Sequence, residues 1–371
     1  MIDSPILLAA GGTGGHLFPA EALAHALAAR GLAVELVTEE RALRYGGAFP
    51  ARAMHVIPAG TPRGGSLLAK AQAVARLALG TAQAAALLRQ VKPAAVIGFG
   101  GYPTVPPLLA ASYLGLPSAL HEANGVMGKA NRFLAGRVDR IAAGLPTLAV
   151  PAALQSKLVI TGNPVRPNVL EAAKTPYPSF DDGIVRLLVA GGSQGARVMA
   201  DIVPAAVAAL PDALRAKVAV VQQARPEDIA RVEAIYAGAG VGAEIAPFFA
   251  DFPARLAAAH FVITRAGAST VSELAVVGRP AMLVPLPHAL DQDQAANAAF
   301  LEAAGGAETV RQSDFTPEFL TRRLCDLINA PAQLSARAEA AKSVGVADAA
   351  ERLADLIIDV ARTVATKRSY G

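Results

Sequence analysis

A buried strand that runs into a glycine-rich turn and then a helix is the feature that most constrains this fold. Residues 6–10 are apolar, and four glycines follow within the five residues 11–15. A helical pattern begins near Pro19. Glycine lets backbone N–H groups approach an anion, and the N-terminus of the following helix favours negative charge at the same point. The stretch therefore predicts a phosphate-binding turn after the first strand of an α/β sheet.

The spacing in this turn differs from a dinucleotide-binding fingerprint, which needs G-x-G-x-x-G and an acidic residue about 20 positions later. The third glycine is missing, because His16 and Leu17 follow Gly14 and Gly15. Acidic residues at 39–40 end the next apolar run, so the turn alone leaves a dehydrogenase and an ordinary glycine turn as alternatives. His16 is unusual there, because an imidazole beside a phosphate can act as a base near neutral pH.

Composition indicates two globular domains without internal disulfides. The chain has 371 residues, of which 53% are hydrophobic and 17% charged, and domains usually hold about 100–200 residues. Cys325 is the single cysteine, which fits a reducing compartment. We expect no secretory leader. We also expect no membrane span, because four prolines interrupt the least charged stretch, 103–120.

Positive charge is concentrated in the first part of the chain. Residues 1–163 hold fourteen Lys or Arg against seven Asp or Glu, a net charge of +7 within a total of +4. Between residues 41 and 121 there is no acidic residue. This asymmetry favours an anionic partner, either nucleic acid, a phospholipid surface or a diphosphate substrate, although a merely solvated basic face remains an alternative. The low aromatic content, 5%, argues against single-stranded nucleic acid.

Alternating apolar runs and helical patterns predict parallel sheets covered by helices on both faces. In the first half, the predicted strands are 6–10, 33–38, 55–58, 94–99, 118–122 and 140–143, and the predicted helices are 20–30, 67–90, 105–114 and 129–135. Residues rich in Pro and Gly at 161–167 and 175–178 indicate a linker.

The strand, glycine loop and helix then recur. A strand at 185–190 leads into the loop 191–196 and a helix to residue 210, and further strands are predicted at 217–222, 243–247, 261–264 and 281–285. The predicted fold class is α/β, with two Rossmann-like doubly wound domains facing a cleft to which each contributes a phosphate-binding turn. A last helical pattern covers 347–365 and could pack on the first domain.

Five motifs, of which the glycine loop at 191–195 is one, follow the first glycine loop in order. They are His-Glu-Ala-Asn at 121–124, Gly-Asn-Pro-Val-Arg at 162–166, Gly-Gly-Ser-Gln-Gly at 191–195, Arg-Ala-Gly-Ala-Ser-Thr-Val-Ser-Glu at 265–273 and Asp-Gln-Asp-Gln-Ala-Ala-Asn-Ala at 291–298. Over residues 6–304 the chain resembles the MurG family of glycosyltransferases, which have the GT-B fold and act in bacterial cell-wall synthesis. The resemblance implies an acceptor and membrane-associating domain at 1–163, a UDP-sugar donor domain at 164–345, and a C-terminal helix at 346–371 that packs back on the first domain.

The resemblance also implies the reaction and its partners. N-acetylglucosamine would pass from UDP-N-acetylglucosamine to the muramyl 4-hydroxyl of undecaprenyl-pyrophosphoryl-MurNAc-pentapeptide (lipid I), with inversion, to give lipid II. The alternative is another GT-B transferase that uses a UDP-sugar and a different lipid or small-molecule acceptor. Expected partners are these substrates, the cytoplasmic face of an anionic plasma membrane to which the protein binds peripherally, and other cell-wall synthesis proteins, but no nucleic acid. No cofactor and no metal are expected.

In the first domain, the resemblance assigns His16 as the catalytic base. The turn that includes Thr13, Gly14 and Gly15 would hold the acceptor diphosphate. Asn124 would contact sugar hydroxyls and Arg166 would lie near the donor, unless Arg166 is simply a linker residue. His121 and Glu122 could instead hold the loop that carries Asn124. For membrane binding, the candidates are Leu67, Leu68, Leu77, Lys70 and Arg76.

In the second domain, donor binding is assigned to the loops and to one helix. Ser193, the backbone of Ala268 and Ser269, and the Thr270 hydroxyl would bind phosphate, and Glu273 would accept hydrogen bonds from the ribose. The backbone of Phe249 would read uracil, so that its side chain carries little weight, and Gln294 would bind sugar hydroxyls. Ser269 could instead cap its helix with Ser272 or Glu273 reaching back. We interpret Asp291 and Asp293 as acids at a helix N-terminus rather than a metal site; Asp293 also stands where the family often has His.

Overall fold

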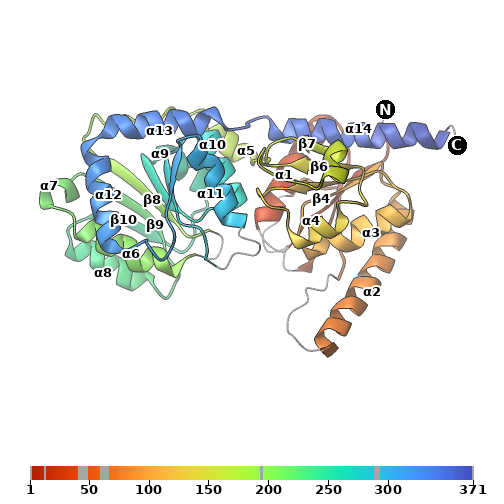
Figure 1. Cartoon of the computed structure of the whole chain (residues 1–371), viewed down its shortest axis with the longest axis horizontal. Helices are drawn as coiled ribbons and strands as arrows, with labels where there is room; N and C mark the ends of the chain where they lie inside the picture. The colour runs from red at the N-terminus through yellow and green to blue at the C-terminus, as the bar shows by residue number, and fades with distance from the viewer. Residues whose placement is uncertain are drawn as a thin grey trace. The chain divides into compact units, whose positions relative to one another are not determined.

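The computed structural model describes residues 2–11, 14–40, 49–58, 67–192, 195–287 and 293–369. The chain divides into two compact units (Figure 1). Unit 1 comprises Met1–Arg166 and Ala347–Gly371, and unit 2 comprises Pro167–Val346. The C-terminal segment therefore belongs to the same unit as the N-terminus.

Unit 1 is built on a seven-stranded sheet of described residues, with the order β3-β2-β1-β4-β5-β6-β7 and every pairing parallel. Its strands are β1 Ile6–Ala9, β2 Val34–Thr38, β3 Ala53–Val56, β4 Ala95–Gly98, β5 Ser118–Glu122, β6 Arg140–Ala143 and β7 Leu158–Ile160. Its helices are α1 Gly14–Ala29, α2 Leu67–Val91, α3 Val105–Tyr113, α4 Lys129–Leu134 and α14 Ala349–Ser369, with short 3₁₀ turns at Tyr102–Thr104 and Ala152–Lys157.

Alternate residues of the unit 1 strands face opposite helix layers. Ile6 and Leu8 of β1 pack with α1 and α14, whereas Leu7 packs with α2, α3 and α4. Because both faces are covered, β1 is apolar at every position and is completely buried. This explains why the strand appears in the sequence as a continuous apolar run.

Unit 2 repeats this architecture with a six-stranded parallel sheet, in the order β10-β9-β8-β11-β12-β13 among the described residues. Its strands are β8 Val185–Ala190, β9 Val218–Gln223, β10 Gly242–Ala246, β11 Phe261–Thr264, β12 Ala281–Leu283 and β13 Ala307–Thr309. Its helices are α5 Pro167–Ala172, α6 Arg197–Ala208, α7 Asp212–Arg215, α8 Ile229–Gly238, α9 Phe252–Ala258, α10 Ala268–Val277, α11 Asp293–Ala303, α12 Pro317–Asn329 and α13 Pro331–Ser343. Two doubly wound α/β units are thus present, as the sequence predicts.

Some predicted element boundaries are wrong. The first helix begins at Gly14 rather than near Pro19, which lies inside α1, so His16 belongs to the first helical turn and not to a loop. Helix α5 interrupts the predicted linker. The strands β7 and β13 were not predicted, because three residues at a sheet edge carry too little periodicity to be recognised.

Strand order reverses once in each sheet, and this locates the sites. In unit 1 the reversal lies between β1 and β4, and in unit 2 between β8 and β11. At such a switch point the loops after the two strands lead to opposite faces and leave a crevice outside the carboxyl ends, where open α/β sheets bind ligands. The four loops concerned begin at Ala10, Phe99, Gly191 and Arg265.

A buried arginine ties together two helices of unit 2. The guanidinium of Arg279 donates to the carbonyl of Ala257 in α9, to Val277 and Gly278 at the end of α10, and to Pro176 before β8. Burial lowers its pKa to about 10, with Tyr177 opposing the effect. The negative ends of two helices thus compensate the charge, and no carboxylate of the described residues forms an ion pair with Arg279. This fixes α10, whose N-terminus carries one of the predicted donor motifs.

Candidate active site

The imidazole of His16 lies against the turn that follows β4. A methyl group added at Gly100 would be 3.2 Å from His16 Cε1, and one added at Gly101 would be 3.3 Å from His16 Cδ2. Both glycines have positive φ, 88° and 74°, a conformation that residues with a side chain rarely adopt. The first turn of α1 and the turn after β4 therefore meet at the predicted base, and the glycine pair leaves room for its ring.

Glu122 organises the loop that carries Asn124. This buried carboxylate accepts hydrogen bonds from the backbone and side-chain N–H groups of Asn124, both at 3.0 Å. Gly128 N–H and Asn131 Nδ2 donate to its other oxygen at 2.9 and 2.8 Å. The contacts of Glu122 thus agree with the alternative in which Glu122 holds the loop, and the same contacts orient Asn124.

His121 is fully buried one residue earlier. Burial lowers its pKa from 6.5 to about 4, the hydrogen bond with the Gly162 carbonyl opposes this, and the charge of His16 adds to the lowering. Its ring centroid lies 5.5 Å from that of Phe99. His121 is therefore neutral at physiological pH and is a core residue of unit 1.

The side chain of Arg166 packs on Phe18, near the start of α1. Its guanidinium carbon is 3.9 Å from the centroid of the Phe18 ring, a cation–π contact, and this ring lies against Gly14. Burial raises the pKa of Glu21, and the charge of Arg166 partly opposes that effect. The structure thus brings Gly14, Gly15 and His16 together with a cation at a helix N-terminus, an arrangement that favours anions.

In unit 2, the loop after β8 folds back tightly on itself. A methyl group at Gly191 would lie 2.0 Å from the backbone nitrogen of Ala196, so this position requires glycine. Ala196 is the N-cap of α6 and makes no side-chain capping bond. Ala196 thus offers no capping side chain to the first N–H groups of α6, and a helix N-terminus favours an anion.

Gln223 connects this loop to the loop after β10. Its Oε1 accepts from Gly191 N–H, and its Nε2 donates to the Pro247 carbonyl, both at 3.1 Å. Gln223 was not predicted from the sequence, because a glutamine at the end of a strand has no local signal. Its position as the last residue of the alternating strand β9, next to β8, would have been the clue.

The loop after β11 exposes a second helix N-terminus. Gly267 is the N-cap of α10 without a side-chain capping bond, so the alternative in which Ser269 caps this helix is wrong. Ser272 instead donates to the Ala268 carbonyl at 2.9 Å. Among the described residues, the buried Ser269 Oγ has no hydrogen-bond partner. Thr270 is half-buried and Glu273 is buried in the following turn.

Helix α11 supports this second loop. Asn297 is completely buried, and its Nδ2 donates to the Ala266 carbonyl at 3.1 Å. Gln294 Oε1 accepts from Leu286 N–H at 3.0 Å. Asp293 accepts from Gln294 N–H at 2.7 Å and begins the helix, as an N-terminal acid does.

The predicted base-reading position, Phe249, follows β10. Its side chain is 6% exposed and packs under Arg255, whose guanidinium carbon is 4.3 Å from the ring centroid. Arg255 was not predicted from the sequence. Three predicted residues, Thr13, Ser193 and Asp291, lie outside the described residues.

The described part of the chain lacks two features that would bear on function. It contains no cluster of three or more His, Cys, Asp or Glu side chains that could hold a metal ion. No helix within the same residues has both the length and the apolar character needed to cross a membrane.

Known domain families match both units. The N-terminal domain of glycosyltransferase family 28 matches residues 6–143, and the C-terminal domain of this family matches residues 186–353. Together with the two doubly wound sheets, these matches define the chain as a GT-B glycosyltransferase of family 28.

Comparison with individual relatives shows which family within this class the chain belongs to. The chain is 56% identical to a UDP-N-acetylglucosamine–N-acetylmuramyl-(pentapeptide) pyrophosphoryl-undecaprenol N-acetylglucosamine transferase of Methylobacterium radiotolerans, over 96% of this chain and 97% of the relative. It is 57% identical to the transferase of the same name from Brucella canis, over 95% of this chain and 93% of the relative. The crystal structure of Acinetobacter baumannii MurG matches with a TM-score of 0.77 at 30% identity, over 96% of this chain and 99% of that one. The chain therefore belongs to the MurG family.

A more distant match shows the fold alone. The UDP-GlcNAc 2-epimerase of Neisseria meningitidis, solved with UDP-GlcNAc bound, has a TM-score of 0.67 at 14% identity and covers 95% of this chain.

Proposed function

We infer that this protein transfers N-acetylglucosamine from UDP-N-acetylglucosamine to the muramyl 4-hydroxyl of lipid I, with inversion at the sugar carbon, and so forms lipid II for peptidoglycan. The observation that carries this inference is identity of 55–57% over nearly the full length to transferases named for this reaction. The two switch points, each with glycine-rich backbone beside a helix N-terminus, provide the chemistry that two diphosphate substrates need.

In the proposed mechanism, His16 removes the proton from the 4-hydroxyl. The hydroxyl oxygen attacks the anomeric carbon of the donor sugar, and the bond from that carbon to the UDP oxygen breaks. The pair Gly100 and Gly101 restricts the ring of His16 to one face of the turn. Thr13, Gly14 and Gly15 hold the acceptor diphosphate at the N-terminus of α1, and Asn124, oriented by Glu122, contacts sugar hydroxyls.

The donor residues stabilise the departing UDP. N–H groups at the start of α6 and α10, with Ser193, Ala268, Ser269 and Thr270, bind the diphosphate as its charge develops. The unpartnered Ser269 Oγ supports this role, because a buried hydroxyl normally has a partner. In this proposal Arg166 lies near the donor. Its contact with the Phe18 ring holds its positive charge in place, which supports this role.

Glu273 binds the ribose, the backbone of Phe249 reads uracil, and Gln294 binds the hydroxyls of the donor sugar. Because amide-rich loops carry the charge of the leaving group, we propose that no metal is required. Activity that survives chelation by EDTA would agree with this, and restoration by Mg²⁺ of activity lost in EDTA would contradict it.

We propose that the protein binds peripherally to the cytoplasmic face of the plasma membrane through the basic unit 1. Val74 and Leu79 of α2 are exposed at 66% and 54%, with Arg76 between them. Leu77, a predicted membrane residue, is instead half-buried against the core, and the side chains of Leu67, Leu68 and Lys70 lie outside the described ones. We expect the protein to bind anionic liposomes and the binding to weaken as salt is added. Binding that depends neither on anionic lipid nor on salt would contradict the proposal.

The test of the reaction is UDP release from UDP-N-acetylglucosamine with and without a lipid I analogue, with UDP-N-acetylgalactosamine and UDP-glucose in parallel. Release that needs both the analogue and the N-acetylglucosamine donor is expected. Tight UDP binding without acceptor-dependent release would favour the alternative, a GT-B transferase with another acceptor.

A further inference from the structure

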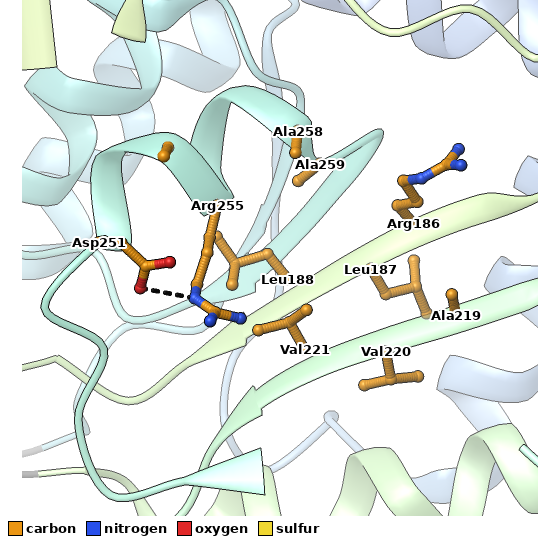
Figure 2. Close-up of a pocket in the computed structure, with 11 residues that line it drawn as sticks. Arg186, Leu187, Leu188, Ala219, Val220, Val221, Asp251, Arg255, Ala258 and Ala259 are labelled. Carbon is orange, nitrogen blue, oxygen red and sulfur yellow. Dashed lines mark hydrogen bonds and ion pairs between the residues drawn. The ribbon is translucent and has the colours of Figure 1, made fainter. Parts of the chain in front are cut away.

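Arg255 of α9 joins three groups around the loop that follows β10. Its two terminal nitrogens donate to the two carboxylate oxygens of Glu244 at 2.7 and 2.8 Å, and its Nε donates to Asp251 Oδ1 at 2.7 Å. The planar guanidinium at the same time lies over the Phe249 ring, at 4.3 Å. These hydrogen bonds lower the pKa of both carboxyl groups. Figure 2 shows Arg255 directed toward Asp251 above the strand residues Leu188 and Val221.

These contacts determine which side chain of the loop after β10 points into the protein. Phe249 is 6% exposed, whereas its neighbour Phe248 is 73% exposed, so the chain places one ring inside and the other outside. The inward ring is covered by Arg255, which is anchored at Glu244 in β10 and at Asp251 before α9. At the other end, Gln223 holds the Pro247 carbonyl. The peptide groups around Phe249 are therefore held from both sides.

A cavity beside Arg255 indicates why the contact between Arg255 and Phe249 matters. A cavity of about 420 Å³ lies between α9 and the strands β8 and β9, and Arg255 and Asp251 line one end of it. Packing of α9 on β8 and β9 is thus incomplete next to the loop, so the loop needs a further constraint at this end. The charged clamp supplies that constraint, because a planar guanidinium can pair bidentately with a carboxylate and stack on a ring at the same time.

We propose that Arg255 is a positioning residue for recognition of the donor base: it acts through the Phe249 ring to hold the backbone of residue 249 where it reads uracil. This inference rests on the proposed function, which assigns uracil to that backbone. It gives the Phe249 side chain a role that the sequence did not indicate. Arg255 itself does not touch the substrate.

The experiment measures binding of UDP and CDP to the full-length chain by calorimetry, together with kcat and KM for UDP-N-acetylglucosamine. The variants are Arg255→Ala, Arg255→Lys, Phe249→Leu and the double variant Arg255→Ala/Phe249→Leu. Arg323→Ala is a matched control, because Arg323 also pairs bidentately with one carboxylate, Glu308, and singly with another, Asp326, at similar exposure in unit 2. Unlike Arg255, Arg323 makes no cation–π contact within the described part of the chain.

For Arg255→Ala we expect a dissociation constant for UDP raised about tenfold, a difference of ~1.4 kcal/mol. The preference for UDP over CDP should fall, KM should rise, and kcat should change less than about twofold, because uniform binding is lost and not transition-state binding. Lysine should not restore the preference, since it cannot stack as a plane. The double variant should be no worse than either single variant, because both remove the same contact. Arg323→Ala should match the wild type.

Three results would overturn the inference. They are wild-type UDP affinity and selectivity in Arg255→Ala, additive effects in the double variant, or equal loss in Arg323→Ala. If the wild-type protein itself does not bind UDP, the proposed function fails, and this inference fails with it. If the wild-type protein binds UDP and Arg255→Ala binds it with the same affinity and selectivity, only this inference fails and the proposed function stands.

Discussion

At the scale of single residues, the site depends on side chains whose neighbours restrict them. His16 is held between the start of α1 and the Gly100–Gly101 turn, and Asn124 is oriented by Glu122. Restriction of this kind matters for catalysis, because a base must lie within hydrogen-bond reach of the proton that it removes.

Replacement of His16 tests its proposed role as base. His16→Ala should lower kcat by about 10²–10⁴-fold, the usual contribution of a general base, while UDP affinity stays unchanged. UDP release with the lipid I analogue measures the first quantity and calorimetry the second. His25→Ala, on the same helix α1, is the matched control and should retain activity. Near-normal turnover of His16→Ala would remove His16 as the base.

His121 makes the stability of unit 1 depend on pH. Its pKa is about 4 when buried, against 6.5 for an unperturbed histidine. Between these values the unfolded chain binds a proton that the folded chain does not. The free energy of unfolding therefore has its full value above about pH 6.5 and falls as the pH drops toward 4, by up to about 3 kcal/mol.

Urea unfolding of the wild type and of His121→Gln, from pH 7.5 to 4.5, measures this effect. The variant should show a shallower loss of stability toward low pH, whatever its stability at neutral pH. His260 also has its pKa lowered, chiefly by burial, and contributes a slope of the same sign. The comparison of the two proteins isolates His121, and identical slopes would refute the expectation.

At the scale of elements, the donor loops depend on backbone geometry. The loop after β8 closes on Gly191, with Gln223 from the end of β9 bonded to it. The N-cap residues of α6 and α10, Ala196 and Gly267, make no side-chain capping bond, as in most of the described helices, and a helix N-terminus of this kind favours an anion.

Gly191→Ala tests the loop after β8. The new methyl group would lie 2.0 Å from Ala196 N and 2.6 Å from Gly195 C, so the loop must open. We expect the dissociation constant for UDP to rise at least about tenfold, because the N–H groups at the start of α6 are displaced. Gly242→Ala in β10 is the control, because a methyl group there meets no atom within 4 Å. Equal UDP affinity of the two variants, by calorimetry, would contradict this account.

At the scale of the whole molecule, the chain returns to its first unit. After α13 in unit 2, residues from Ala347 onward belong to unit 1 (Figure 1). Leu353 and Ile357 of α14 are fully buried against the layer that contains α1, and Arg30 of unit 1 pairs with Glu351 and Asp355. The stability of unit 1 therefore depends on α14, which lies far along the chain from the other elements of this unit.

Leu353→Ala should lower the free energy of unfolding of unit 1 by about 2–5 kcal/mol, the usual cost of a cavity at a buried leucine. Arg352→Ala is the control on the same helix; this side chain is 52% exposed, and a change within about 0.5 kcal/mol is expected. Thermal unfolding followed by circular dichroism measures both. A Leu353→Ala variant as stable as the control would mean that α14 contributes little to the core.

Much of the fold could be predicted from the sequence, because parallel sheets covered on both faces require continuous apolar strands. β1 is apolar throughout, whereas β5, β6, β8 and β11 contain shorter apolar runs; each of the five begins and ends within one residue of its predicted limits. Two edge strands, β7 and β13, were not predicted, since they have three residues each, whereas the longer edge strands β3 and β10 were. The start of α1 was placed too late, because glycine and proline in the first turns of a helix resemble a loop in sequence.

The sequence by itself determined the class of the protein and the motifs of its site. Glycine loops after buried strands, and motifs in a fixed order, are local properties of the chain. Only the tertiary structure decided which residues support those motifs. Gln223, Arg255 and Asn131 lie far along the chain from the groups that they hold, or on other elements, and no periodicity marks them. Their partners are set by strand order and register, which bring together the carboxyl ends of strands that are not consecutive in sequence.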